Sequence, residues 1–153
     1  MSDDTYLTAL KMLGRRELSE AQLRQRLLRR QYDSDAIDAA IARLKSDRSL
    51  DDERVAGAIA RSETNLKKRG RYRVTRQIEQ AGIAPSIVKR IVDETFAAID
   101  GDALLAQALG RRLRGRTRIA DDCEFQRLYR YLVAQGFEPD RVMALLRTYN
   151  REQ

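Results

Sequence analysis

Two stretches of the chain concentrate positive charge, and side chains of this type at this density bind polyanions. The segment KKRGRYRVTR (67–76) holds six lysines and arginines in ten residues and no acid, and GRRLRGRTR (110–118) holds five arginines and no acid. Lysine and arginine bind phosphate groups through charge, and arginine adds parallel N–H donors. The candidate binding residues are therefore Lys67, Lys68, Arg69, Arg71, Arg73, Arg76, Arg111, Arg112, Arg114, Arg116 and Arg118.

The net charge of +7 originates in the middle of the chain. Residues 1–60 contain 11 basic and 11 acidic residues, residues 61–120 contain 14 and 6, and residues 121–153 contain 5 and 6. Such an asymmetry indicates a partner that is nucleic acid or an acidic protein surface, although a cation run can also be a plain solvated face.

Local helix electrostatics explain only part of the first basic stretch. Lys67, Lys68 and Arg69 stand at the expected end of a helix, where the helix dipole favours cations. Arg71 and Arg73 stand at the expected start of the next helix, where the dipole opposes positive charge. We interpret this conflict as a sign of an external anion.

Enzyme chemistry is poorly supported by the residue types present. The chain has no histidine, which removes the commonest general base and metal ligand, and it has no glycine-rich phosphate-binding loop. Its one cysteine, Cys123, has no histidine partner and is expected to be a half-buried helix residue. Asp51, Asp52 and Glu53 could form a metal cluster, but the start of a helix explains them better. We therefore predict no catalytic residue, no cofactor and no bound metal.

A repeated apolar pattern predicts the elements that hold these charges. Three segments space five apolar residues at intervals of 4, 5, 5 and 4 residues. They are Leu23, Leu27, Tyr32, Ile37 and Ile41; Val74, Ile78, Ile83, Val88 and Val92; and Leu128, Leu132, Phe137, Val142 and Leu146. The pairs at i, i+4 indicate the inner faces of two helices, and the middle residue is expected to fill the turn between them. Three copies in register indicate an internal repeat.

Turn and cap residues support this helix–turn–helix interpretation. Gly82 and Gly136 stand where the first helix of a copy should end in left-handed backbone. A proline follows each of these glycines three residues later, near the start of the second helix, where a missing N–H is tolerated. Ser19 and Gln22 have the spacing of a capping box at the start of the first copy.

Each copy is preceded by a further helix, for which Asp51 and Asp102 are N-cap candidates in the second and third copies. These helices are expected at residues 3–14, 52–69 and 102–114. The sequence therefore predicts an all-α protein of about nine helices in three tandem three-helix repeats, stacked into an elongated, curved modular rod. The expected repeats are residues 1–50, 51–100, which is the basic one, and 101–153.

Several motifs, in their order along the chain, resemble the RecX family of bacterial recombination regulators, which are built from tandem three-helix repeats. The segment LDDERVA (50–56) is close to the family signature Leu-Asp-Asp-x-Arg-Phe-Ala, and its matching positions include Leu50, Asp51, Asp52 and Arg54. Further motifs that are similar are ELSEAQLRQRL (17–27), RSETNLKKRG (61–70), RQIEQAGI (76–83) and FQRLYRYLVAQGF (125–137). Together they cover nearly the whole chain. Two motifs depart from the family pattern: the signature phenylalanine is Val55, and Gly-x-Gly-Pro reads Lys68-Arg69-Gly70-Arg71.

The resemblance implies a non-enzymatic modulator of the RecA recombinase, with a role in DNA recombination, DNA repair and the SOS response. Members of the family bind the RecA filament on DNA, along its groove, and typically inhibit ATP hydrolysis, strand exchange and the stimulated cleavage of a repressor. The implied partners are the RecA filament and single- or double-stranded DNA, with no small-molecule substrate. The signature residues are expected to serve the structure, and the cations of the two basic stretches to contact RecA or DNA.

Two other functions are open on the residues alone. The chain could be a helix-turn-helix-like DNA-binding protein that acts through its central basic patch, or a helical-repeat scaffold for an acidic protein. Against base reading, the second helices of the copies carry no consistent set of arginine, asparagine and glutamine. The first ten residues do not resemble a secretory signal and no apolar run is long enough to span a bilayer, so we expect a cytoplasmic protein without membrane contact.

Overall fold

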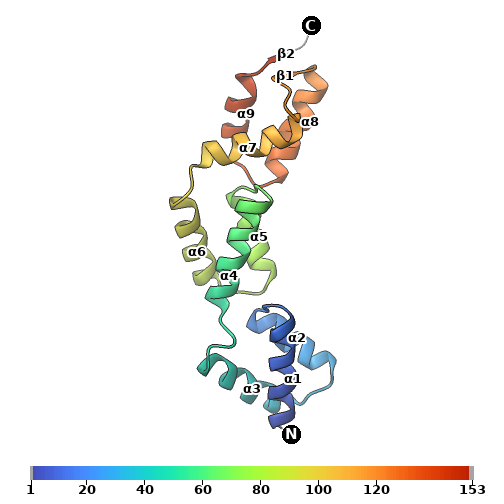
Figure 1. The fold of residues 1–153 in the computed structure, drawn as a ribbon, viewed down its shortest axis with the longest axis vertical. Helices are drawn as coiled ribbons and strands as arrows, with labels where there is room; N and C mark the ends of the chain where they lie inside the picture. The colour runs from blue at the N-terminus through green and yellow to red at the C-terminus, as the bar shows by residue number, and fades with distance from the viewer. Residues whose placement is uncertain (1, 152–153) are drawn as a thin grey trace. The chain divides into compact units, whose positions relative to one another are not determined.

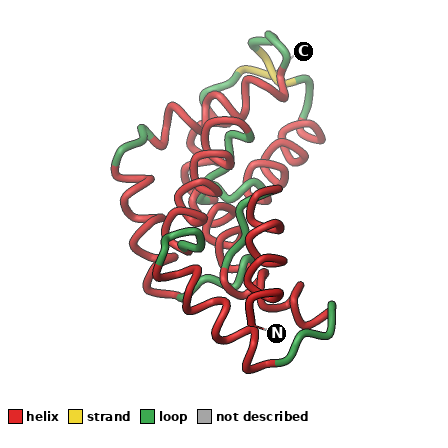
Figure 2. Tube along the Cα trace, turned by 60° about the horizontal axis from the view of Figure 1, so that its bottom comes forward, coloured by secondary structure: helices red, strands yellow, loops and turns green. Residues whose placement is uncertain are grey.

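The computed structural model describes residues 2–151, and this part of the chain is almost entirely helical (Figure 1). Its α-helices are α1 (Ser2–Arg15), α2 (Glu20–Arg29), α3 (Ser34–Ser46), α4 (Asp52–Arg61), α5 (Arg71–Gln80), α6 (Pro85–Ala97), α7 (Gly101–Leu113), α8 (Asp122–Ala134) and α9 (Pro139–Arg147). A π-helical segment, Ser62–Leu66, continues α4. Figure 2 shows short loops between the helices and one small pair of strands. The predicted all-α class is confirmed.

The described chain forms two compact units. Unit 1 consists of the residues up to Ala58 together with Ile78–Ile91, and unit 2 consists of Ile59–Gln77 together with the residues from Val92 onwards. Helices α4, α5 and α6 therefore contribute residues to both units. The predicted repeat boundaries remain a proposal.

The core of unit 1 is formed by α1, α2 and α3 with the loops that join them. The helix α1 packs against α3, and α2 contacts both (Figure 1). The fully buried side chains include Leu23 and Leu27, one turn apart on α2, and Ile37, Ile41 and Leu44 on α3. Because residues spaced by three or four positions share one face of a helix, each helix presents one apolar stripe to the others.

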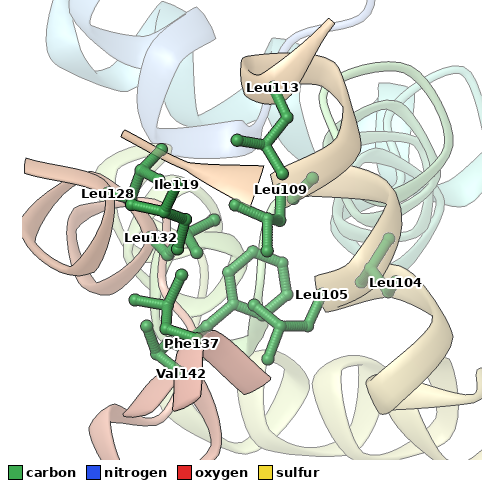
Figure 3. Close-up of a cluster of buried hydrophobic side chains, with 11 residues drawn as sticks. Leu104, Leu105, Leu109, Leu113, Ile119, Leu128, Leu132, Phe137 and Val142 are labelled. Atoms are coloured by element: carbon green, nitrogen blue, oxygen red, sulfur yellow. The ribbon is translucent and has the colours of Figure 1, made fainter. Parts of the chain in front are cut away.

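The core of unit 2 gathers side chains from α7, α8 and α9 (Figure 3). The residues from α7 point toward those of α8 and α9, with Phe137 and Ile119 among them. The buried members are Leu104, Leu105, Ala108, Leu109, Leu113, Ile119, Leu128, Leu132, Phe137, Val142 and Leu146. This cluster holds the second basic stretch at its edge, because that stretch begins inside α7 and ends at Arg118, directly before the buried Ile119.

The apolar skeleton read from the sequence describes the observed interior closely. Of its fifteen residues, every one except Tyr32 is buried. Tyr32 is half-buried because its hydroxyl reaches polar partners: it lies 2.8 Å from the Thr8 hydroxyl and donates to the Asp4 carboxylate at 3.1 Å. A phenol at this position fills the turn while keeping its oxygen hydrogen-bonded.

The turn and cap predictions are confirmed at four positions. Gly82 and Gly136 adopt positive φ angles of 75° and 101°, which an L-residue rarely adopts. Ser19 accepts a hydrogen bond from the backbone N–H of Gln22 at 3.1 Å, and the Gln22 side chain accepts from the Ser19 N–H at 3.0 Å. This reciprocal pair satisfies two donors that the start of α2 leaves without helical partners.

Two helix boundaries differ from the prediction. The N-cap of α7 is Asp100 and not Asp102, because the helix begins earlier and the Asp100 carboxylate accepts from the N–H groups of Asp102 and Ala103. The helix expected over 52–69 is regular only to Arg61. A wider π turn follows, in which Glu63 is buried.

The strand pair and the cysteine were also not anticipated. Strand β1 (Arg118–Ile119) pairs in parallel with β2 (Asn150–Arg151), with Arg118 opposite Asn150. A strand of two residues is too short to show the alternation of apolar and polar residues from which strands are predicted, so the sequence does not predict β1 or β2. Cys123, expected to be half-buried, is exposed because it occupies the first turn of α8 on a side away from the core.

Candidate functional site

All eleven candidate cations lie in unit 2. Those of the first stretch follow the π-helical segment and enter α5, and those of the second run from the end of α7 to β1. A hydrogen bond ties the second stretch to the residue directly before the first: the Arg111 guanidinium donates from Nη1 to the backbone carbonyl of Leu66 at 2.7 Å. Stretches that are about 45 residues apart in sequence therefore meet in one unit.

The first stretch turns at a crossing of two glycine backbones. The Gly70 N–H donates to the Gln135 carbonyl at 2.8 Å, and the Tyr72 N–H donates to the Gly136 carbonyl at 3.0 Å. A Cβ added at Gly70 would lie 2.6 Å from the Gly136 carbonyl oxygen, inside van der Waals contact. Only glycine permits this approach, which fixes where α5 starts.

Arg71 occupies the first position of α5. Proline is tolerated at such a position because the first helical N–H groups have no helical acceptor. The family proline and the arginine found here are therefore compatible with the same helix start.

A buried glutamate holds part of the first stretch in place. Glu63, 4% exposed, lies 2.8 Å from Arg69 Nη1 and 3.5 Å from Lys67 Nζ. Arg69 also donates from Nε to the Gln135 side chain at 3.4 Å. A buried carboxylate needs compensating charge, and these two cations supply it. Lys67 and Arg69 therefore have an internal role beyond any favourable contact with a helix dipole.

The interpretation that Arg71 and Arg73 need an external anion stays a prediction, although both arginines also have contacts within the protein. Arg71 forms an ion pair with Asp93, which offsets the unfavourable helix dipole from within the protein. Arg73 donates from Nη1 to the Ala134 carbonyl at 3.2 Å. Its Nε is the buried side-chain polar atom that lacks a hydrogen-bond partner among the described residues. Both arginines thus have intramolecular contacts that the sequence did not reveal.

The second stretch is partly anchored as well. The Arg112 guanidinium lies over the Tyr131 ring, 4.1 Å from its centroid. Arg116 forms two hydrogen bonds with the Glu124 carboxylate, at 3.0 and 2.8 Å. These hydrogen bonds, followed by one from the Ala120 N–H, lower the pKa of Glu124 below its ordinary value. Tyr131, Glu124 and Ala120 therefore determine where these two arginines lie.

The remaining candidates are Lys68, Arg76, Arg114 and Arg118, and their side chains have no hydrogen bond or ion pair with the part of the chain that the structure describes. Lys68 and Arg114 both have left-handed backbone, with φ of 52°. The first basic stretch also includes Tyr72, 57% exposed, whose ring could stack on an unpaired base. These side chains are available to bind phosphate.

A cavity of about 450 Å³ lies beside the glycine crossing in unit 2. Its polar lining mixes Arg71 and Arg141 with Asp100, Asp102 and Glu138. Arg141 pairs with Asp102 at 3.5 Å, so much of this charge is internally balanced. The cavity has no histidine, cysteine or serine that could act as a nucleophile or base.

The signature residues lie in unit 1, around the start of α4. Leu50 is buried, and Asp51 accepts from the N–H groups of Glu53 and Arg54 at 3.0 and 3.3 Å. Asp52 accepts from the N–H of Glu20, the first residue of α2, at 2.8 Å. All four signature positions thus make contacts within the protein.

Arg54 links several loops of unit 1. Its guanidinium pairs with Glu17 and donates to the carbonyls of Arg48 and Ser49 at 3.0 and 3.1 Å. The carboxylates of Asp51 and Asp52 accept hydrogen bonds from backbone N–H groups. The carboxylate of Glu53 forms an ion pair with Arg90 at 2.6 Å. No group of metal-ligating side chains is found within the described residues.

The residues that sequence reasoning missed are the acidic partners, namely Glu63, Asp93 and Glu124. The spacing of Glu63 and Lys67 at i, i+4 was a readable sign of an ion pair. Asp93 lies 22 residues from Arg71 along the chain, and no sequence period connects them.

Comparison with known proteins identifies what this arrangement is similar to. A family model described as RecX, first three-helix domain, matches residues 6–44. The chain is 31% identical to the regulatory protein RecX of Syntrophotalea carbinolica over 135 residues, covering 88% of each chain. It is 30% identical to the regulatory protein RecX of Halorhodospira halophila over 136 residues, covering 89% of this chain and 82% of the relative.

Two solved structures share the fold. A crystal structure titled regulatory protein RecX aligns with a TM-score of 0.74 at 19% identity, covering 96% of this chain and 71% of the other. The crystal structure of RecX from Lactobacillus salivarius aligns with a TM-score of 0.73 at 17% identity, covering 96% and 95%. No helix in the described part of the chain is both long and apolar enough to cross a membrane.

Proposed function

Because the chain belongs to the RecX family of regulatory proteins, we propose that it is a non-enzymatic regulator of the RecA recombinase filament. It binds the filament on DNA, along its groove, and inhibits the ATPase, strand-exchange and coprotease activities of RecA. The protein acts in the cytoplasm, where recombination and the SOS response take place. Its partners are RecA and single- or double-stranded DNA, and it needs no cofactor.

The observation that supports this proposal is that both basic stretches lie in unit 2, where they can form one contact surface for RecA and DNA. Arg111, in the second stretch, donates a hydrogen bond to the carbonyl of Leu66, the residue directly before the first stretch. Carboxylates orient four of the cations, namely Lys67, Arg69, Arg71 and Arg116. Side chains held in this way lose little conformational entropy on binding. The cations without described internal partners then add contacts to DNA phosphates, which are independent of sequence and sensitive to salt.

A groove-bound chain would act by bridging successive RecA subunits. Contacts on both sides of the groove would hold neighbouring subunits in one arrangement and exclude DNA and repressor from it. Since ATP hydrolysis by a filament requires subunits to change their arrangement together, a bridge of this kind lowers turnover without chemistry of its own.

The test is the single-stranded-DNA-dependent ATPase of RecA, titrated with this protein at low and moderate salt. The variant Lys68→Glu/Arg76→Glu/Arg114→Glu reverses three cations that have no described internal partner. We expect it to need roughly ten times more protein for half-inhibition, because it loses phosphate contacts. The matched control is Arg127→Glu/Arg130→Glu/Arg147→Glu, which reverses three exposed cations of the same unit outside the basic stretches.

The two variants have the same net charge, so equal inhibition by both would remove the basic stretches from the contact surface. A parallel titration measures direct affinity for the same DNA without RecA. Tight, salt-sensitive DNA binding with no effect on the ATPase would instead favour a helix-turn-helix-like DNA-binding protein. Binding to an acidic protein without nucleic acid would favour a repeat scaffold.

A further inference from the structure

Five arginines at the ends of two helices, or directly after them, line one cavity in unit 1. The cavity measures about 350 Å³ and is bounded by Met12 and by Arg15, Arg16, Arg26, Arg29 and Arg30. Arg15 ends α1 and Arg29 ends α2, so the two helices bring their last turns to one place. The lining contains no acid and no lysine.

None of these five arginine side chains has a hydrogen bond or ion pair with the described residues. Several acids of unit 1 pair with cations outside the cavity. Glu17 pairs with Arg54, Glu20 lies 3.5 Å from Lys45, and Asp38 lies 2.6 Å from Arg24. The cavity therefore keeps its positive charge uncompensated by neighbouring carboxylates.

The tertiary structure creates this patch from a sequence that is locally neutral. Residues 1–60 hold 11 basic and 11 acidic residues, and nothing in that balance indicates a polyanion site. Five of the 11 cations line one cavity, and none of the 11 acids does.

Helix dipoles do not account for the gathering of these charges. Cations are favoured at helix C-termini, but each terminus carries only about half a negative charge. Two termini thus offset roughly one of the five positive charges. Arg26 and Arg29 are also neighbours at i, i+3 on α2, where like charges disfavour the helix. Local physics opposes the arrangement, and a ligand that supplies several negative charges would relieve it.

We propose that this arginine cavity is a second nucleic-acid contact, which binds the phosphodiester backbone of single-stranded DNA. Guanidinium groups bind phosphate through paired N–H donors and stay charged at all accessible pH values. A backbone supplies one negative charge per nucleotide, so that a short segment can engage several of the five arginines. The choice of DNA phosphate over another polyanion rests on the proposed function, whereas the site itself rests on unit 1 alone.

The test compares two variants of unit 1 with the same change of charge. Arg26→Gln/Arg29→Gln removes two cations from the cavity, and the control Lys11→Gln/Arg24→Gln removes an exposed cation of α1 and a half-buried cation of α2, both outside the cavity lining. Affinity for fluorescent oligothymidylate is measured by anisotropy over a salt series, in the full chain without RecA.

We expect the cavity variant to bind roughly tenfold more weakly, with a salt slope shallower by about 1.4, since each phosphate contact on a single strand contributes about 0.7. The control should stay within about twofold of the wild type. The thermal midpoint of the cavity variant should be unchanged or higher, because it relieves repulsion. Equal weakening of both variants would overturn the proposal.

A second measurement locates the contact directly. Phenylglyoxal modifies accessible arginines, and peptide mass analysis reports how far oligothymidylate protects each one. Protection of Arg26 and Arg29 but not of Arg24 is expected, and its absence would overturn the proposal. If polyglutamate protects the same arginines as well as DNA does, the cavity is a site for acidic protein and the phosphate assignment is wrong. Loss of DNA binding in the cavity variant, together with a RecA ATPase that the wild-type protein leaves unchanged, would leave this proposal standing and reject the proposed function.

Discussion

In unit 1 the turn at Ala81–Gly82 lies against the start of α2, and in unit 2 the turn at Gln135–Gly136 lies against the start of α5. These two junctions occupy equivalent positions in the repeat. Ser19 and Gly70 are offset by 51 residues and Gly82 and Gly136 by 54, as are the apolar skeletons around them.

The two junctions use different chemistry. In unit 1 the Ser19 hydroxyl donates to the Ala81 carbonyl, while a Cβ added at Gly82 would meet only the side chain of Ala21. In unit 2 the Gly70 N–H donates to the Gln135 carbonyl, and Gly136 faces backbone. The atom that crowds the first junction is a methyl group that one substitution can remove, whereas the second junction is crowded by backbone atoms that no substitution removes. The second junction should therefore tolerate substitution less well than the first.

The largest expected effect is that of Gly136→Ala. An added Cβ would lie 2.7 Å from the Gly70 carbonyl oxygen and 2.6 Å from Arg73 Cβ, in backbone with φ of 101°. Overpacking and the positive φ together should destabilise unit 2 by roughly 3 kcal/mol, measured by urea unfolding. Gly115→Ala is the control, because Gly115 has φ of 84° and nothing within 4 Å of the added atom. Similar losses in both variants would show that backbone strain, and not the crossing, is responsible.

The next effect concerns the hydroxyl of the first junction. Ser19→Ala removes the helix cap and leaves the Ala81 carbonyl without its donor, which should cost about 2 kcal/mol. Ser19→Gly installs the residue found at the equivalent position of unit 2, and glycine is itself a tolerable cap. Its smaller loss in thermal unfolding should therefore report the Ala81 hydrogen bond alone. If the glycine variant matches the wild type, that bond contributes nothing measurable.

A smaller effect separates the two glycine turns. Gly82→Ala should cost roughly 1–2 kcal/mol, because its added Cβ meets the Ala21 side chain at 2.6 Å. Part of this loss should be recovered in the Ala21→Gly background, where the obstructing methyl is absent. The coupling is measured by a double-mutant cycle of unfolding free energies. No equivalent rescue exists for Gly136, since its neighbours include the backbone N of Arg73 and the carbonyl oxygen of Gly70.

The smallest effect concerns how the stability of the protein depends on pH, for which one carboxylate of each unit makes an opposite contribution. Burial, partly opposed by the hydrogen bond from the Glu20 N–H, raises the pKa of Asp52 above its ordinary value. A raised pKa means that the folded state binds the proton more tightly, so this contribution to stability is lost as pH rises through the folded pKa. The pKa of Glu124 is lowered instead, so its contribution is present above the ordinary pKa and is lost as pH falls through the folded one.

Asp52→Asn and Glu124→Gln should therefore change the thermal midpoint with opposite trends between about pH 3 and pH 7. Relative to wild type, Asp52→Asn should gain stability as pH rises. Over the same rise in pH, Glu124→Gln should lose up to about 1 kcal/mol of stability relative to wild type. Parallel curves for the two variants would contradict the assigned environments of these carboxylates.

The amino-acid sequence by itself determined the helices, most of their ends and the interior. Apolar spacing, a capping serine and two turn glycines are local signals, because helical periodicity relates residues only three or four positions apart. For the same reason the sequence placed fourteen of the fifteen skeleton residues in the interior correctly, along with the capping pair of Ser19 and Gln22. Its charge blocks also located the candidate cations of the two basic stretches.

The tertiary structure alone decided what each of those cations contacts. Asp93 beside Arg71, the Leu66 carbonyl beside Arg111 and the Gln135 carbonyl above Gly70 come from distant parts of the chain. The arginine cavity of unit 1 is a further example, because a segment with zero net charge became strongly charged on one side. Such outcomes depend on how closely distant backbone segments approach and on which side chains they bring together. A helical period relates only residues three or four positions apart, so it encodes neither of these.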